Sequence, residues 1–594
     1  MPIGGRWTPP EEWVIWEIPY TQSTQTGGKA SITRQVSLGK APGGQTMPTK
    51  SFALLSFEDQ ILLRDELIEP GTLPWLLREH ASLLFPKWLF AGWKGEVKVG
   101  RKAWPGGLLM ALLLLRHSEA GQTRVGAIRR AGADASWRSA LRLPWSEKPP
   151  TEKTLREFEA FLKEDHPDTE RARFELAFEH WTRLCLEAGL VGEAPVWVAD
   201  STPMWCFGAV HGTVRLLGDG LRSLARLWAS ARKVELRTVA LEWDSLLLVA
   251  KSTKGFFEGT DWSDMKARSK VLTELVATVA RATERVLAGL ETVRPNKRKR
   301  LARRCKNLLR VVEEDLEGTE DGGLRVRRRR SAKRLISVTD PEAQHFRKSA
   351  SKVCSGFKIH GLGDAVSGLV LALSVTPGGI HDSTQLVPLL ELARSLRDDI
   401  EEVLADTAYG GMETRNAAKT LGVEVVAPPV RNSRKGDGVG REDFAIDFEA
   451  QVMTCPGGVS TTRCTRFDNG ALRSFTWTKA SEAACSCRDK CLVHKARPRK
   501  DGSLGPPRRR MVLHPDEEGL RAARAEWNKP ERRTRYRRRG EGERLMRELT
   551  RRGARHAAGW GLESAALQAH AAASVGNLLI LAKHLAGRSR RKAA

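Results

Sequence analysis

Apolar residues that recur three and four positions apart predict helices in the first half of the chain. From about residue 53 to residue 190 the pattern is helical, with an apolar stripe that runs from Leu108 to Leu115. Thr151 opens the amphipathic stretch TEKTLREFEAFL and stands where its side chain would cap a helix. The same spacing returns over 213–317. The sequence therefore predicts two large helical blocks.

Short apolar runs between and after these blocks predict strands. They are VWVAD ending at Asp200, RLISVTD ending at Asp340, FKIHG at 357–361, GLVLALSVT at 368–376, EEVLAD ending at Asp406, and VEVVAPP. GDAVS, between the third and fourth runs, predicts a hairpin connection, and METRNAAKTLG predicts a helix that ends at Gly422. We expect an α/β fold whose mixed sheet is flanked by helices and interrupted by a large helical insertion.

Changes in pattern and composition divide the chain into parts. The first 50 residues are rich in Gly, Pro, Thr and Ser and lack a sustained period, which is typical of an unstructured leader. The predicted parts are a variable, partly disordered region at 1–98, a helical domain at 99–190, a sheet-containing domain at 191–585 and a basic tail at 586–594. The sheet-containing domain carries a helical insertion at 207–330 and a Gly-, Arg- and Cys-rich insertion at 430–530.

The charge of the chain points to a polyanionic partner. The 594 residues include 98 Lys and Arg against 71 Asp and Glu, a formal net charge of +27. A nucleic-acid backbone is the commonest polyanion that such a surface binds. Nine cysteines are too few for a disulfide-stabilised fold of this length, which favours a reducing compartment. The start of the chain lacks a secretory pattern, and the longest apolar run, Leu108–Leu115, is about half of what a bilayer requires. We expect a cytoplasmic protein with no membrane span.

Two acidic residues, Asp200 and Asp406, stand at the carboxyl ends of predicted strands, where strand ends converge in open sheets. Carboxylates gathered there can hold the divalent cations that assist phosphodiester cleavage. Two aspartates are too few to hold these cations, so a third carboxylate is required. Glu543 in the basic helix RTRYRRRGEGERLMREL is the candidate. The alternatives are turn chemistry at the strand ends and a solvated Glu in a run of charges.

Five strings in order resemble one family of enzymes. They are ADSTPMWCFGAVHGTVRLLGDGLR, SVTDPEAQHFRKS, FKIHGLGDAVSGLVLALSVTPGGIHD, VLADTAYGG and YRRRGEGER. They resemble the DDE transposases of bacterial insertion sequences, and among these the branch with an Asp-Ser-Thr (DST) first motif, a long helical insertion and a Cys-rich late insertion. The resemblance runs from about residue 99 to 585 and implies a ribonuclease-H-like catalytic domain.

The resemblance also implies which residues carry the chemistry. Asp200, Asp406 and Glu543 would form the catalytic triad and bind Mg²⁺ or Mn²⁺. Tyr536 and Arg539 match the spacing that the family shows before its Glu. The residues implied to contact DNA in this region are Tyr536, Arg539, Arg544 and Arg551.

The chain departs from the family near its third acid. Thr550 stands where the family has Lys, with Arg551 beside it, which puts that basic phosphate contact in doubt. Glu541 would replace Glu543 if the register slipped by two positions.

Two further pairs stand near the other motifs. His211 and Gly212 occupy positions where the family commonly has Gln or Glu followed by Asp. His381 and Asp382 are kept, and we interpret them as strand-end residues lining the site, with either a structural or a catalytic role for the histidine.

Basic residues outside the triad predict surfaces for DNA. Basic stretches lie at 297–304, 325–334, 495–510 and 532–539. Any one of them could be a solvated face, but together they would form a positive rim around an acidic pocket. The module at 99–165 resembles the N-terminal DNA-binding domain of these transposases, with a packing domain of basic surface as the alternative. Its candidate phosphate contacts are Arg124, Arg129, Arg130 and Arg138.

Five of the nine cysteines lie between Cys455 and Cys491, with His494 close behind. Such clustering in a reducing compartment suggests zinc. The candidate structural Zn²⁺ ligands are Cys455, Cys485, Cys487 and Cys491. The single-residue gap between the second and third of these is awkward for two tetrahedral ligands, and unligated small hydrophobic side chains are the alternative.

The sequence thus predicts a DNA transposase that binds the ends of its insertion sequence and catalyses metal-dependent strand cleavage and strand transfer. Its partners would be double-stranded DNA and a second copy of the chain, as a homodimer in the active complex. The alternative is a catalytically inactive, host-retained DNA-binding protein of the same ancestry, which metal-dependent nicking would exclude. An RNA-binding module is less favoured, because three tyrosines and no aromatic-rich segment offer little to stack on bases.

Overall fold

The computed structural model describes most of the chain as two compact units. The described residues are 68–94, 103–331, 333–349, 351–429, 439–467, 472–478, 480, 485–487, 490–491, 503 and 510–593. Unit 1 comprises Met1–Pro195, Ser201–Ile380 and Arg544–Ala594, and unit 2 comprises Val196–Asp200 and His381–Glu543. The predicted leader, residues 1–50, lies outside the described residues.

An N-terminal helical region in unit 1 agrees with the spacing of apolar residues. Its elements are α2 (Leu73–Glu79), α3 (Ala81–Leu84), η1 (Lys87–Phe90), α4 (Gly106–His117), α5 (Arg124–Ala133), α6 (Ala135–Ala140), α7 (Glu152–Lys163) and α8 (Arg173–Glu187). The expected cap forms at α7, where the Thr154 amide donates to Oγ1 of Thr151 at 3.2 Å. Helices α2, α3 and η1 lie in the segment that the sequence predicted to be variable.

Unit 1 is built around the C-terminal helix α20 (Leu562–Ala593), which packs on α8, α4, α2, α7 and strand β6. By length and composition its stretch Leu562–Arg588 could cross a membrane, with a mean hydropathy of 1.4, but 78% of the apolar window is buried. That burial is typical of the core helix of a folded domain. Asn577 fixes the helix to the sheet, since its side chain accepts from the Val370 amide at 3.0 Å and donates to the Val370 carbonyl at 2.8 Å.

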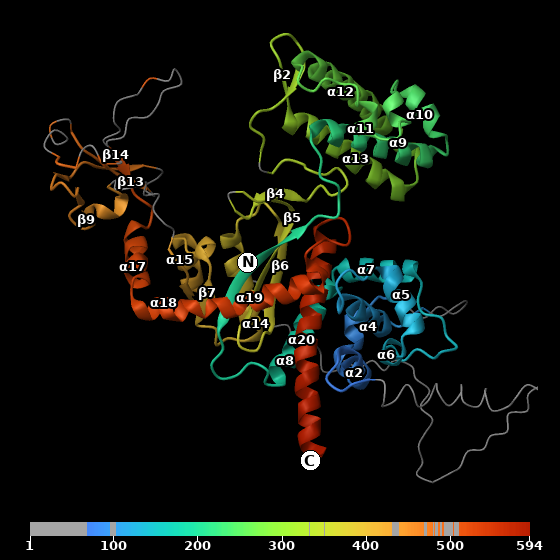
Figure 1. Ribbon diagram of the computed structural model, residues 1–594, viewed down its shortest axis with the longest axis horizontal. Coiled ribbons are helices and arrows are strands. Elements are labelled where there is room, and N and C mark those ends of the chain that lie inside the picture. Colours follow the sequence, from blue (N-terminus) through green and yellow to red (C-terminus); the bar gives the residue numbers. More distant parts are fainter. Residues whose placement is uncertain are drawn as a thin grey trace, which may run out of the picture. The chain divides into compact units, whose positions relative to one another are not determined.

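The predicted helical insertion is present in unit 1. Its elements are α9 (Thr213–Arg232), α10 (Leu236–Glu242), η2 (Leu246–Leu248), α11 (Thr253–Phe256), α12 (Met265–Ala288), η3 (Leu290–Thr292), α13 (Pro295–Asp315) and the hairpin of β2 (Leu316–Gly318) with β3 (Leu324–Val326). Helices α9, α12 and α13 lie side by side (Figure 1). The hydrophobic core that they share includes Trp228 and Trp243.

Strands β4, β5 and β6 of unit 1 pair antiparallel. β5 (Val353–Asp364) pairs with β6 (Val370–Pro377), which confirms the predicted hairpin, and with β4 (Gln344–Arg347). The run RLISVTD was wrongly predicted to be a strand. It bears no ladder in its described residues, and β4 takes the edge beside β5 instead. The Asp340 carboxylate anchors the irregular segment by accepting from the amides of Gly208 and Gly561.

Strand β1 (Trp197–Trp205) belongs to both units. In unit 2 its first residues pair in parallel with β7 (Glu402–Ala405), which pairs in parallel with β8 (Glu424–Val426). In unit 1 the strand continues to Trp205, and Cys206 then donates to Ser355 of β5. The sequence predicted an end at Asp200, but the strand continues through Thr202, Pro203 and Met204, which are all buried. Parallel and antiparallel pairs together make the expected mixed sheet.

Helices and short 3-10 turns complete this part of unit 2. They are η4 (Asp382–Gln385), α14 (Leu386–Leu396), η5 (Thr407–Tyr409) and α15 (Met412–Thr420). The predicted helix end at Gly422 agrees with the structure, because this glycine has a φ of +73° just after α15.

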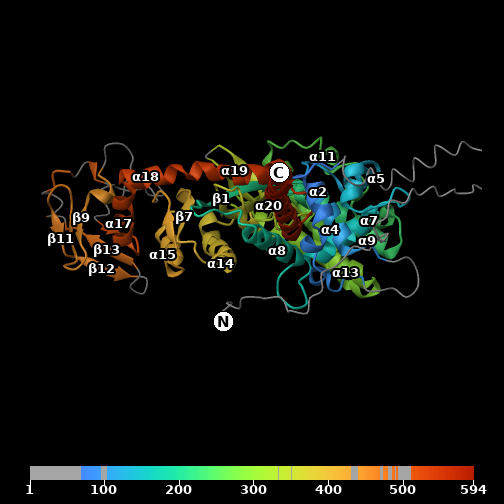
Figure 2. The ribbon, with the colours of Figure 1, turned by 90° about the horizontal axis from the view of Figure 1, so that it is seen from below.

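The segment predicted as a Cys-rich insertion forms two small sheets in unit 2 (Figure 2). Their strands are β9 (Ala445–Asp447), β10 (Val452–Thr454), β11 (Ser460–Thr461), β12 (Cys464–Phe467), β13 (Leu472–Thr476) and β14 (Arg510–Val512). Phe444, Met453, Phe475 and Trp477 form their core. The helices α17 (Glu517–Trp527), α18 (Pro530–Arg537) and α19 (Arg539–Leu549) follow.

Candidate active site

The register between β1 and β7 brings Asp200 and Asp406 side by side in unit 2. The strands run parallel with Ala199 opposite Ala405, and the next residue on each is the aspartate. Asp406 keeps an extended backbone, with φ −78° and ψ 178°. Paired strands lie about 4.8 Å apart and equivalent positions face the same side. The two carboxylates therefore occupy one face at one level.

The first turn of α19 approaches that face through a glycine. A Cβ placed on Gly542 would lie 2.5 Å from Cγ1 of Val198, which is closer than two carbon atoms can pack. Val198 is two positions before Asp200, so both side chains project from the same face of β1. Gly542 thus permits the contact that sets α19 beside Asp200. Sequence patterns do not indicate this residue, because its role depends on a tertiary contact.

Arg539 links Asp200 to Glu543. Its Nη2 lies 3.3 Å from Oδ1 of Asp200, and its Nη1 lies 3.9 Å from Oε1 of Glu543, one helical turn later. The Arg539 and Asp200 side chains are 19% and 17% exposed, whereas that of Glu543 is 70% exposed. The alternative acid Glu541 instead pairs with Arg538 at 3.3 Å. The i,i+4 pair favours Glu543 as the acid on the Asp200 side of the helix.

Ion pairs hold α18 against the parallel strands of unit 2. Arg532 lies 2.5 Å from Oε1 of Glu424 on β8, and Arg535 lies 2.7 Å from Oε1 of Glu402 on β7. Burial raises the pKa of Glu402 despite the two arginines. Because α18 directly precedes α19, these pairs help to fix the helix that carries Arg539.

Tyr536 packs near the acidic face. Its ring meets that of Trp527 edge to face, with centroids 4.9 Å apart. Burial raises the pKa of the Tyr536 hydroxyl, and Asp406 and Asp200 act in the same direction against Arg539. The phenol is therefore a neutral hydrogen-bond donor at neutral pH.

Two short 3-10 helices bring further polar groups to this region. Asp406 caps η5, since its Oδ1 accepts from the Ala408 amide at 2.9 Å. Helix η4 packs against η5 and begins with Asp382. The exposed His381 caps η4 by accepting from the Ser383 amide at 3.3 Å, which is a structural role.

The donor set suits a hard divalent cation. Within the described parts of the chain, no three carboxylate, imidazole or thiol groups converge on a point that would hold a metal ion. The Arg539 guanidinium instead supplies the positive charge beside Asp200, and so stands where a cation's charge is needed. Carboxylate oxygens are the ligands that Mg²⁺ and Mn²⁺ prefer. Asp200 and Asp406 would hold the ion, with Glu543 one turn along α19 from the guanidinium.

The other basic residues expected to contact DNA near the third acid have different surroundings. In unit 1 Arg544 donates from Nη2 to the Ala365 carbonyl at 2.9 Å. Arg551 is 67% exposed and lies 2.8 Å from Oε2 of Glu548. Arg551 therefore remains at the surface, whereas the Arg544 guanidinium is held by a hydrogen bond to a backbone carbonyl.

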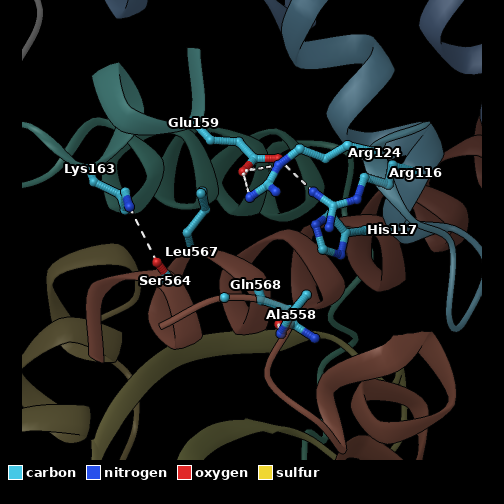
Figure 3. A pocket seen from close by; sticks show the side chains of 10 residues that line it. Arg116, His117, Arg124, Glu159, Lys163, Ala558, Ser564, Leu567 and Gln568 are labelled. Carbon is cyan, nitrogen blue, oxygen red and sulfur yellow. Dashed lines mark hydrogen bonds and ion pairs between the residues drawn. The ribbon is translucent and has the colours of Figure 1, made fainter. Parts of the chain in front are cut away.

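The arginines of the helical region separate into inward and outward groups. In Figure 3, Arg116 and Arg124 converge on Glu159 beside a small cavity of about 30 Å³. Their nitrogens lie 2.5 and 2.6 Å from its two carboxylate oxygens. Lys163, on the same helix as Glu159, donates to Ser564 of α20 at 3.2 Å. Arg124 thus ties α5 to α7 within unit 1.

The remaining arginine candidates differ in exposure. Arg130 pairs with Asp134 at 2.9 Å and with Glu119, whereas Arg129 is exposed. The expectation for Arg138 is corrected, because this side chain is only 2% exposed. Its guanidinium donates to the backbone carbonyls of Ala131, Gly132, Pro144 and Glu147. Arg138 therefore stabilises the fold and cannot reach a phosphate.

The expected four-cysteine zinc site is not assembled in the described residues. The Sγ atoms of Cys455 and Cys485 lie 3.6 Å apart, and burial and the Cys455 thiol raise the pKa of Cys485. Cys455, Cys485 and Cys491 pack against the aromatic core of the small sheets. His494 and most of the basic stretch at 495–510 lie outside the described residues.

The comparisons with known proteins agree with a phosphoryl-transfer site. Residues 324–578 match the family described as Transposase DDE domain. The match covers less than half of the chain; it includes Asp406 and Glu543 and begins after Asp200. A search of curated proteins and a search of solved structures each found no match. The protein is an enzyme with a DDE transposase domain, a catalytic domain whose substrate is DNA.

Proposed function

We propose that the protein is the transposase of a bacterial insertion sequence, with Asp200, Asp406 and Glu543 as its catalytic triad. The observation that carries this proposal is the register of β1 on β7, which puts two carboxylates side by side beneath the first turn of α19. A ribonuclease-H-like arrangement of this kind suits Mg²⁺ or Mn²⁺. When bound, a pair of such cations activates the nucleophile and neutralises the leaving oxygen of a phosphodiester.

The chain's own residues bind and orient the DNA in this proposal. Arg539 carries a guanidinium that matches the geometry of a phosphate, so it leaves Asp200 for the scissile phosphate when DNA and cation are bound. Tyr536 offers a neutral hydroxyl donor on the same side. Asp200 and Asp406 keep their positions because their strands are paired, and Glu543 turns from solvent toward them.

Binding of the ends of the element would use the basic surface of the helical region, including Arg129. Strand transfer at two ends implies at least a homodimer in the active complex, acting on DNA in the bacterial cytoplasm. The competing function is a DNA-binding protein that has lost cleavage.

One experiment separates these functions. Linear DNA bearing the inverted repeats that flank the gene is incubated with purified protein in Mg²⁺, Mn²⁺ or EDTA, and strand breaks are mapped on a sequencing gel. We expect cuts at the repeat ends with either cation and none in EDTA. Asp200→Ala should bind the DNA as the parent does but leave it uncut. Binding without cutting by the parent protein would support the inactive alternative.

A further inference from the structure

A third aspartate, Asp382, lies in the same part of unit 2 as the two already assigned to the cation site. Asp382 is the first residue of η4, and Asp406 is the N-cap of η5. The two short helices pack against each other in unit 2. Asp406 is in turn level with Asp200 through the pairing of β1 and β7. Chain segments far apart in sequence therefore bring three carboxylates to one region.

Tyr409 gives an independent sign that this region is built for a ligand. Its side chain is completely buried, and its hydroxyl has no hydrogen-bond partner among the described residues. Burial raises the pKa of Tyr409 well above its usual 10, and the charges of Asp382, Asp406 and Asp200 add to this in that order. A buried hydroxyl without a partner destabilises the fold, so its retention beside three acids points to a partner that arrives with the ligand.

We propose that Asp382 is a fourth carboxylate of the cation site and shares a divalent cation with Asp406. The Tyr409 hydroxyl orients these two carboxylates by donating a hydrogen bond. The proposal rests on the proposed function, because it adds a ligand to the same site. It adds a carboxylate to a site in which the Glu543 side chain is 70% exposed. Tyr409 is a positioning residue in this scheme, and Asp382 is a metal ligand.

The test measures Mn²⁺ binding to the full-length protein by electron paramagnetic resonance, without DNA and without turnover. Asp382→Asn should weaken Mn²⁺ binding by at least ~10-fold, the loss seen even for groups one step removed from a metal. Asp382→Glu keeps the charge and should recover part of the affinity. Tyr409→Phe should weaken binding less than Asp382→Asn. The matched control is Glu391→Gln, which removes an exposed carboxylate from α14, the helix that follows η4.

Asp406→Asn distinguishes failure of this proposal from failure of the proposed function. If Asp406→Asn loses Mn²⁺ while Asp382→Asn binds like the parent, the fourth ligand is disproved and the triad stands. If the parent does not bind Mn²⁺, or Asp406→Asn binds it unchanged, both ideas fail. Circular dichroism spectra that overlay the parent's establish that a loss of Mn²⁺ binding is not a loss of fold.

Discussion

Single side chains decide the electrostatics of the pocket. Two carboxylates on neighbouring strands repel each other unless positive charge is close, and Arg539 supplies that charge at 3.3 Å from Asp200. The pair is largely buried, so its loss would leave an uncompensated carboxylate. In the proposed function the guanidinium and a divalent cation would compete for the same acid. Such competition would link metal binding to the release of Arg539 for DNA.

Buried histidines give a pH dependence that can be measured. Burial lowers the pKa of His570 on α20 to about 4, although Nδ1 of its ring donates a hydrogen bond to the Ala566 carbonyl at 2.9 Å. In the unfolded chain the imidazole takes up a proton near pH 6.5, whereas in the folded protein it does so only near pH 4. Protonation therefore leaves the folded state unaffected above about pH 6.5 and lowers the free energy of unfolding as the pH falls toward 4. We expect the side chain to account for about 2 kcal/mol of lost stability at pH 5.

Urea denaturation at pH 7 and pH 5 checks this expectation. Between pH 7 and pH 5 the free energy of unfolding should fall by about 2 kcal/mol less in His570→Phe than in the parent. His556→Gln, a change at an exposed histidine, is the control and should behave like the parent. An equal decrease in the free energy of unfolding from pH 7 to pH 5 in the parent and in His570→Phe would contradict the lowered pKa of His570.

Among the elements, the docking of α19 on β1 depends on one glycine. Gly542→Ala would force a Cβ to within 2.5 Å of Val198, so the helix must move away from Asp200. A displacement of about 1 Å in such a site can lower the rate about 100-fold. Gly540→Ala, two positions earlier, meets nothing within 4 Å and raises helix propensity. We expect cleavage to fall for Gly542→Ala and to stay unchanged for Gly540→Ala.

A double variant makes this test specific. Val198→Ala removes Cγ1 and Cγ2 of Val198, two of the three atoms that the new Cβ would meet, and leaves the Val198 Cβ at 2.8 Å. Val198→Ala with Gly542→Ala should therefore recover part of the cleavage lost in Gly542→Ala alone. Both effects are measured as single-turnover cleavage rates. Equal rates for Gly542→Ala and Gly540→Ala would disprove the close contact as the feature that positions α19.

The sequence was informative for elements whose pattern is local. The hairpin of β5 and β6, the cap at Thr151 and the strand into Asp406 follow from alternation and turn residues. The strand prediction failed for RLISVTD. Leu335 and Ile336 are buried, which gives the same apolar pattern as a strand, but β4 occupies the edge of β5. A single-sequence pattern records burial and cannot record which edge is free.

The site was predictable only in part. Asp200 and Asp406 could be singled out because acids that end apolar runs tend to lie at one edge of a sheet. Their register, the close approach at Gly542 and the burial of Tyr409 depend on contacts between distant segments. Arg138 shows the converse error, since a basic residue in a basic helical region is a backbone anchor. No local pattern distinguishes these cases.

For the whole molecule, the net charge of +27 predicts DNA binding that weakens steeply with salt. Exposed Arg129 and buried Arg138 give a matched pair of changes. Arg129→Ala should weaken binding uniformly across sequences and reduce the slope of log affinity against log salt by about 1. Arg138→Ala should instead lower the melting temperature. An unchanged slope for Arg129→Ala, measured by fluorescence anisotropy, would remove this surface from the DNA contact.

The central claim is that Asp200 and Asp406 hold a divalent cation in place of Arg539. Anomalous diffraction from crystals of the protein grown with Mn²⁺ tests it most directly. We expect an anomalous peak about 2 Å from carboxylate oxygens of both aspartates, with the Arg539 guanidinium displaced from Asp200. An Arg539–Asp200 pair that persists at saturating Mn²⁺, with no peak between the two aspartates, would contradict the account.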